Sequence, residues 1–217
     1  MKVRAYGAGK RVLEYGCGPG SMALYLAANG AHVIGIDISE VAIARAKERA
    51  NEAGVENRTS FQVMDAESMA FPAESFDLIC GAGILHHLDL GKALSEVCRV
   101  LKADGVAIFA EPLGHNPFIN LFRKLTPDLR TVDEHPLRKE DLENIKSYFR
   151  SAEFHYFDLF SLLAVPFHRY PGFKYILSGL EMIDQSLFAS IPWIRKEAWK
   201  VIITLSGPKE GPPSRVC

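Results

Sequence analysis

Short apolar runs alternate with amphipathic stretches along the first half of the chain. Five runs have the length and composition of strands, at residues 11–15, 32–38, 60–64, 76–80 and 106–110. Helical spacing separates them at residues 21–28, 41–53 and 89–102, and Ser39 can cap the second of these helices. Strands that alternate with helices predict crossover connections and a parallel sheet. Because the strands are apolar throughout, we expect helices on both faces of that sheet.

The second half follows a less regular pattern. Residues 111–136 have no clean period and contain four prolines, which predicts an inserted, partly helical segment after the fifth strand. Beyond it, the pattern predicts helices at residues 139–149 and 173–188 and strands at residues 152–163 and 198–205. We therefore expect one domain at residues 1–207, covered by segments near residues 112–136 and 156–192, and a disordered tail at residues 208–217.

The composition is that of a globular protein without a strong charge bias. The chain has 217 residues, and 25 Lys and Arg against 26 Asp and Glu give a formal net charge of −1. This balance argues against a protein held to nucleic acid mainly by phosphate neutralisation. No apolar run is long enough to span a bilayer, and the first residues lack the apolar region of a secretory signal.

Cysteines and aromatic residues add two expectations. The four cysteines, Cys17, Cys80, Cys98 and Cys217, have neither C-x-x-C nor zinc spacing, so we predict no metal site and free thiols in the cytoplasm. Of the 22 aromatic residues, 16 lie at Phe109 or beyond. The second half therefore suits the wall of an apolar acceptor site, peripheral contact with a membrane, or core and dimer packing.

A glycine-rich loop follows the first predicted strand and leads into a helix. Gly16, Gly18 and Gly20 alternate with other residues, whereas the dinucleotide fingerprint G-x-G-x-x-G requires glycine in place of Ser21. Glycine lets the backbone approach a ligand closely, and the start of the helix offers free N–H groups. Glu14, inside the strand end, would repel a pyrophosphate and favours a cationic amino-acid or sulfonium ligand.

Three more residues follow strands at the same expected edge of the sheet. Asp37 ends the second strand, where a carboxylate can accept both hydroxyls of a ribose. Asp65 follows the third strand and can accept an adenine amino group, and Gly81 follows the fourth and leaves room for a ligand. The carboxyl ends of parallel strands are where open α/β sheets bind ligands.

Taken together, these motifs resemble the small-molecule type of class I S-adenosylmethionine-dependent methyltransferases. The resemblance covers about residues 11–112 and rests on LEYGCGPG, GIDIS, DAE, FDLICGAGILHHL and EVCRVLKADGVAIFAEP. It implies a Rossmann-like, doubly wound α/β fold with seven strands, one of them antiparallel. The predicted strand at residues 198–205 suits that antiparallel position.

The same resemblance assigns the cofactor-binding residues. It implies that Glu14, Gly16 and Gly18 contact the methionine part of S-adenosylmethionine and that Asp37 binds the ribose. Asp65 with Ala66 is expected to bind the adenine. Their neighbours Tyr15 and Ile38, together with Gly81, complete the expected cofactor-binding set. The expected product is S-adenosylhomocysteine.

Four histidines are candidate general bases. His86 and His87 follow the fourth strand, beside the expected methyl group, and as sequence neighbours they make a poor metal pair. His115 and His135 lie in or beside the inserted segment. Packing or solvation is the competing explanation for each histidine, because a base is needed only if the acceptor must lose a proton. Glu111, at the end of the fifth strand, is the carboxylate best placed for acceptor contact.

We therefore expect a monomeric or homodimeric methyltransferase that acts on a small acceptor of apolar or aromatic character. One alternative is a non-catalytic S-adenosylmethionine-binding or regulatory subunit that needs a partner to complete its site. Residues 1–10 alone precede the first strand, where the family usually has a helical segment. The other alternative is a nicotinamide-dependent oxidoreductase, against which Gly20 and Glu14 count.

Overall fold

A computed structural model of the chain describes residues 8–116, 119–120 and 135–209. Its strands form one seven-stranded sheet and comprise β1 (Arg11–Tyr15), β2 (His32–Asp37), β3 (Thr59–Val63), β4 (Phe76–Ala82), β5 (Leu101–Pro112), β6 (Phe149–Phe157) and β7 (Lys200–Pro208). The α-helices are α2 (Ser21–Ala28), α3 (Glu40–Glu52), α4 (Leu90–Val100), α6 (Lys139–Tyr148) and α7 (Phe173–Ser190). Short 3₁₀ turns occupy η1 (Glu56–Arg58), η2 (Leu85–His87), η4 (Ser161–Phe167) and η5 (Pro192–Glu197).

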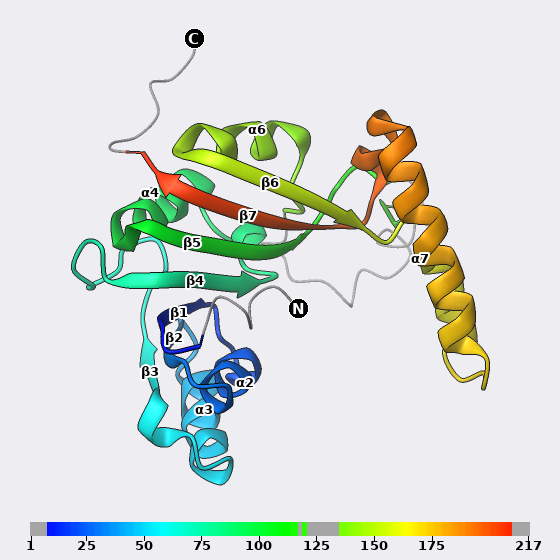
Figure 1. The fold of residues 1–217 in the computed structure, drawn as a ribbon. Coiled ribbons are helices and arrows are strands. Elements are labelled where there is room, and N and C mark those ends of the chain that lie inside the picture. Colours follow the sequence, from blue (N-terminus) through cyan, green and yellow to red (C-terminus); the bar gives the residue numbers. More distant parts are fainter. Residues whose placement is uncertain (1–7, 117–118, 121–134, 210–217) are drawn as a thin grey trace.

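The sheet has the strand order β3-β2-β1-β4-β5-β7-β6 (Figure 1). The pairs β1–β2, β1–β4, β2–β3 and β4–β5 are parallel, whereas β7 runs antiparallel to both β5 and β6. This arrangement confirms the expected α/β sheet with one antiparallel strand. The chain order reverses between β1 and β4, which is the position where doubly wound sheets bind ligands.

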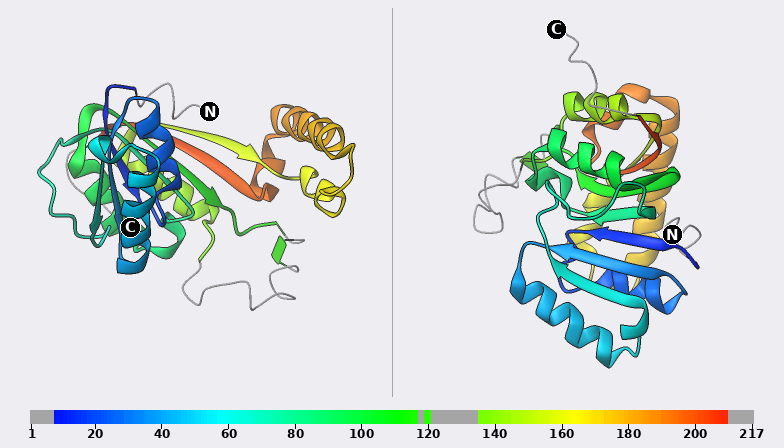
Figure 2. Two further views of the ribbon diagram at one scale, coloured as in Figure 1. Left: turned by 90° about the horizontal axis from the view of Figure 1, so that it is seen from below. Right: turned by 90° about the vertical axis from the view of Figure 1, so that its left-hand side faces the viewer.

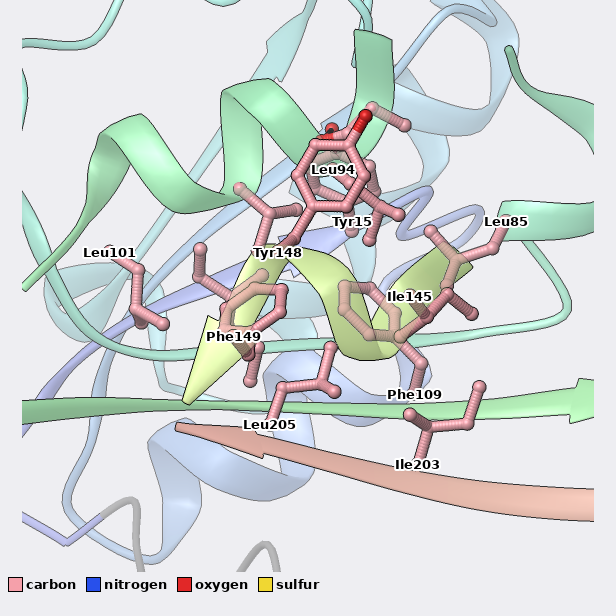
Figure 3. Close-up of a cluster of buried hydrophobic side chains, with 14 of the residues drawn as sticks. Tyr15, Leu85, Leu94, Leu101, Phe109, Ile145, Tyr148, Phe149, Ile203 and Leu205 are labelled. Carbon is pink, nitrogen blue, oxygen red and sulfur yellow. Dashed lines mark hydrogen bonds between the residues drawn. The ribbon is translucent and has the colours of Figure 1, made fainter. Parts of the chain in front are cut away.

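Helices cover both faces of the sheet, as the apolar strands predicted. On one face, Val12 and Leu78 pack with residues of α2 and α3. On the other, Tyr15 and Phe109 pack with residues of α4 and α6, and Figure 3 shows this second cluster. Successive strand residues point to opposite faces, so the helices bury each strand from both sides.

Several element boundaries differ from the sequence prediction: β7, for example, ends at Pro208 rather than at residue 205, and the larger differences concern β5 and β6. The helix α4 ends at Val100 and β5 begins at Leu101, because Leu101 is buried and pairs with Phe76. The strand predicted at residues 152–163 is instead β6, which starts at the buried Phe149 and ends at Phe157. Asp158 then has a φ of 62°, a left-handed conformation that ends the strand.

A projecting lobe, residues 158–199, connects β6 to β7 and contains η4, α7 and η5. Figures 1 and 2 both show α7 standing apart from the other helices, beyond the end of β6. The buried carboxylate of Asp184 in α7 accepts hydrogen bonds from the amides of Leu159, Phe160 and Ser161, at 3.0, 2.8 and 3.0 Å. These bonds fix the start of η4 against α7.

The expectations about the cysteines, the inserted segment, the tail and membrane-spanning helices have different outcomes. Cys17 and Cys80 are buried free thiols and Cys98 is half-buried, whereas Cys217 lies outside the described residues. Most of the inserted segment, residues 117–118 and 121–134, also lies outside them, as do residues 210–217 of the expected tail. Within the described part of the chain, every helix is too short or too polar to cross a membrane.

Candidate cofactor and acceptor site

The sheet register brings the expected cofactor residues to one edge. Tyr15 pairs with Ile36 on β2 and with Gly81 on β4, and Asp37 pairs with Val63 on β3. Strands β1 to β4 therefore end side by side, and the loops that follow them meet at the switch point of the sheet.

The glycine loop adopts a backbone conformation that its glycines permit. Gly16, Gly18 and Gly20 have φ values of 62°, 49° and 75°. The amide of Gly18 donates to Asp37 Oδ2 at 2.8 Å, so the loop is tied to the end of β2. A Cβ atom at Gly18 would meet no heavy atom within 4 Å, which leaves the backbone there open to a ligand.

Glu14 is a buried carboxylate beneath this loop. Its Oε2 atom accepts a hydrogen bond of 2.8 Å from the amide of Ala23 in α2. Burial, more than the nearby Asp37 charge, raises the pKa of Glu14 to about 7. A cationic group of a ligand near this carboxylate would stabilise its charged form and offset the cost of burial.

Tyr15 points to the opposite face of the sheet from Glu14. Its side chain is fully buried, and its hydroxyl donates to the carbonyl of Ala66. Burial raises the pKa of the phenol above its usual range. The Tyr15 side chain therefore belongs to the core, which corrects the expectation that it binds the cofactor directly. Through Ala66, it holds the loop after β3 in place.

The ends of β2 and β3 combine carboxylates with exposed apolar side chains. Asp37 accepts from the amides of Gly18 and Ser39, at 2.8 and 2.9 Å, and Ser39 caps α3 as predicted. Ile38 is 79% exposed, and Val63 lies across from Asp37 and is 49% exposed. Exposed Asp65 makes a local turn by accepting from the Glu67 amide at 2.8 Å. This combination suits a ribose at Asp37 and a flat apolar base against Ile38 and Val63.

Gly81 makes room for a side chain of the protein. A Cβ atom there would lie 2.9 Å from Ile84 and 3.0 Å from the carbonyl oxygen of Tyr15. A Cβ atom at Gly16 would lie 2.6 Å from the same Ile84 side chain. The space expected for a ligand at Gly81 is therefore filled by Ile84, which closes the gap between the ends of β1 and β4.

The turn after β4 is tied to the end of β5 by Glu111. Its carboxylate is 1% exposed and accepts from the amides of Ile84 and Leu85, both at 3.0 Å, through Oε1. Its Oε2 atom lies 2.7 Å from Nδ1 of the buried His86. Because all of this carboxylate is enclosed, the expectation that Glu111 contacts the acceptor is wrong.

The four candidate histidines occupy different environments. His86 is buried against Glu111, whereas His87 is exposed and its ring centroid lies 4.1 Å from that of His86. The amide of exposed His135 donates to the carbonyl of His86 at 3.0 Å. Nε2 of His115 accepts from the Lys139 amide at 2.8 Å, at the start of α6. The structure thus brings three of the histidines together and places His115 in a structural bond.

Comparison with known proteins points to the same methyltransferase family as the sequence motifs. Residues 13–109 match the family described as "Methyltransferase domain". The 27-O-demethylrifamycin SV methyltransferase of Amycolatopsis mediterranei (strain S699) is 40% identical over 100 residues, which are 45% of this chain and 37% of the relative. The uncharacterized methyltransferase YcgJ of Bacillus subtilis (strain 168) is 34% identical over 151 residues, 69% of this chain and 58% of the relative. The chain thus spans less than two thirds of either relative.

A solved structure supports the fold. Phosphoethanolamine N-methyltransferase 2 of Haemonchus contortus, in complex with S-adenosyl-L-methionine, matches with a TM-score of 0.69 at 19% identity. The match covers 95% of this chain and 51% of that protein. Sequence match, sheet order and loop geometry agree: residues 13–109 belong to the methyltransferase domain family, and the sheet has the fold of the solved S-adenosyl-L-methionine complex.

Proposed function

We propose that this chain transfers a methyl group from S-adenosylmethionine to a small acceptor of apolar or aromatic character. The observation that carries the proposal is the shared edge of the sheet. Glu14, the glycine loop and Asp37 meet there, and the apolar lobe leaves the sheet at the same edge.

The residues at the ends of β1 to β3 fit the cofactor. The Asp37 carboxylate can accept from the ribose hydroxyls, Ile38 and Val63 can offer apolar surface to the adenine, and Asp65 can accept from its amino group. The open backbone at Gly18 admits the methionine part, whose ammonium group can offset the buried charge of Glu14. When bound, the cofactor supplies a methyl group that its sulfonium has already activated.

Because the methyl donor is activated, the protein contributes mainly alignment and exclusion of water. Ile84 fills the gap between Gly16 and Gly81, so no ligand can occupy that gap unless the Ile84 side chain moves. If the acceptor must lose a proton, the exposed His87 and His135 are the candidates to take it. His86 and His115 instead hold the surrounding backbone.

The lobe supports an apolar or aromatic acceptor. Exposed large hydrophobic side chains concentrate in it: Phe160, Leu163, Phe167, Tyr170, Tyr175, Ile176, Met182, Ile183 and Trp193. Clusters of this kind commonly mark binding surfaces. The name of the A. mediterranei relative points to 27-O-demethylrifamycin SV as the compound on which that protein acts. We extend only the class of a bulky small molecule to this chain.

Radiolabelled methyl transfer tests the proposal. Purified protein with labelled S-adenosylmethionine is offered phenols and hydroquinones, aliphatic alcohols, phosphorylated amino alcohols, and mixed nucleic acid. We expect transfer to a member of the first two groups and none to nucleic acid. Transfer to nucleic acid would overturn the acceptor class. Binding of the cofactor without transfer to any group would support the non-catalytic alternative.

A further inference from the structure

We propose that Glu111 is a positioning residue for the methyl donor. Its buried carboxylate holds the turn that places Ile84 against the glycine loop, and it thereby sets the shape of the cofactor site. The inference rests on the proposed function, because it concerns the same site. It adds a residue from β5, remote from the cofactor motifs in sequence, to those that determine cofactor affinity.

Strand pairing holds the backbone of Glu111 in place independently of its carboxylate. Glu111 pairs with Val201 inside the β5–β7 ladder, and Pro112 pairs with Lys200. The amide of Gly83 donates to the carbonyl of Ala110 at 2.8 Å, which ties the start of the turn to β5. A carboxylate carried by a paired strand is therefore a rigid reference point for the turn.

The turn on the other side has two amide donors that need a partner from outside the turn. Ile84 is the N-cap of the η2 turn and Leu85 its first residue, and the first amides of such a turn have no partner within it. Glu111 Oε1 satisfies both amides at 3.0 Å, and Oε2 engages His86 at 2.7 Å. A single side chain therefore fixes three consecutive residues.

The consequence reaches the glycine loop through Ile84. The Ile84 side chain packs so closely on Gly16 and Gly81 that a Cβ atom at either position would lie within 3 Å of it. A shift of the turn would move this side chain either into the loop or away from it. We therefore expect loss of the carboxylate to reduce cofactor affinity, although Glu111 itself does not touch the cofactor.

The same fold contains a matched control. Asp184 is also 1% exposed and also holds three consecutive residues, here through their three amides, but it lies on α7 in the lobe. Replacing either carboxylate by leucine leaves buried amides unsatisfied and should lower stability. Only the Glu111 substitution should also change the cofactor site.

Calorimetric titration with S-adenosylhomocysteine, well below the melting temperature, tests the inference on wild type, Glu111→Leu, Glu111→Gln and Asp184→Leu. We expect Kd to rise at least about tenfold in Glu111→Leu and less than about threefold in the other two variants. Glutamine can still accept from both amides, so it should rescue binding. Hydrogen exchange at the Ile84 and Leu85 amides should accelerate in Glu111→Leu alone.

The outcomes separate this inference from the proposed function. Failure of the wild type to bind S-adenosylhomocysteine would overturn the proposed function. Equal affinities of the wild type and folded Glu111→Leu would overturn the positioning role and leave the cofactor site intact. Equal weakening by Asp184→Leu would also overturn it, because the effect would then reflect general loss of stability.

Discussion

Glu14 is the residue at which stability and ligand binding conflict most directly. Because burial raises its pKa to about 7, the folded state holds the proton more tightly than the unfolded state, whose carboxyl has a pKa of 4.5. The stability that comes from the protonated form is complete below pH 4.5 and is lost as pH rises through about 7. At higher pH the buried charge costs about 3 kcal/mol.

This conflict predicts the effect of Glu14→Gln. The amide keeps an oxygen that can accept from Ala23 and has no proton to lose. We expect similar stabilities for variant and wild type at pH 4.5 and a variant more stable by about 3 kcal/mol at pH 8. Urea unfolding at the two pH values measures the difference. A stability difference that is the same at both pH values would contradict the assignment of the pKa shift to burial.

At the residue scale, the sequence predicted which residues lie at the strand ends better than it predicted what their side chains face. Glu14, Asp37 and Asp65 could be placed at strand ends from the motif alone, and the register confirms that position for Glu14 and Asp37. The sequence also placed Tyr15, Gly81 and Glu111 along their strands, but it could not predict which groups surround them. Whether Glu111 faces solvent or the amides of Ile84 and Leu85 depends on a tertiary contact between β5 and the β4 turn.

At the scale of elements, the glycine loop offers a matched comparison. Gly16 and Gly18 both have positive φ, but only a Cβ atom at Gly16 would meet the Ile84 side chain. We expect Gly18→Ala to cost about 1 kcal/mol of stability, from backbone strain, and Gly16→Ala to cost at least about twice that.

For Gly18→Ala, the effect on ligand binding should be large although the loss of stability is small. Gly18→Ala places a methyl group in space that the protein leaves open, so it should weaken S-adenosylhomocysteine binding by at least about tenfold while folding is nearly intact. Denaturation and calorimetry on the two variants measure both effects. Equal stability losses in the two variants would contradict the role assigned to Ile84.

Element boundaries show where local pattern was insufficient. The helix α2 and the strand β1 have the predicted bounds, because apolar spacing and glycines mark both ends. The start of β5 and the end of β6 could not be predicted. They depend on the pairing of Leu101 with Phe76 and on the capture of the Leu159 amide by Asp184, 25 residues away.

For the whole molecule, we expect cofactor binding at the ends of β1 to β4 and acceptor binding at the projecting lobe to be separable. Tyr175 and Met182 lie seven residues apart in α7, on one face of the helix, and are 72% and 69% exposed. Replacing both with serine should change stability by less than about 1 kcal/mol. S-adenosylhomocysteine affinity should stay unchanged, because neither residue lies at the ends of β1 to β4.

The double substitution should weaken binding of the acceptor. For the best phenolic or aliphatic acceptor found by methyl transfer, we expect KM to rise about fivefold or more while kcat changes little, because the lobe binds and does not react. Steady-state kinetics of the double variant and of Val41→Ser, an exposed apolar control on α3, makes the comparison. An unchanged KM in the double variant would remove the lobe from the acceptor site.

The central claim is that the edge formed by β1, β2 and β3 binds S-adenosylmethionine. Calorimetric titration of the wild type, Asp37→Ala and Ser39→Ala with S-adenosylmethionine, S-adenosylhomocysteine and NAD tests it most directly. We predict micromolar binding of both sulfur compounds and none of NAD. Asp37→Ala should bind at least about tenfold more weakly, whereas Ser39→Ala, which loses only the α3 cap, should bind nearly normally. Binding of NAD in place of the sulfur compounds would contradict the account.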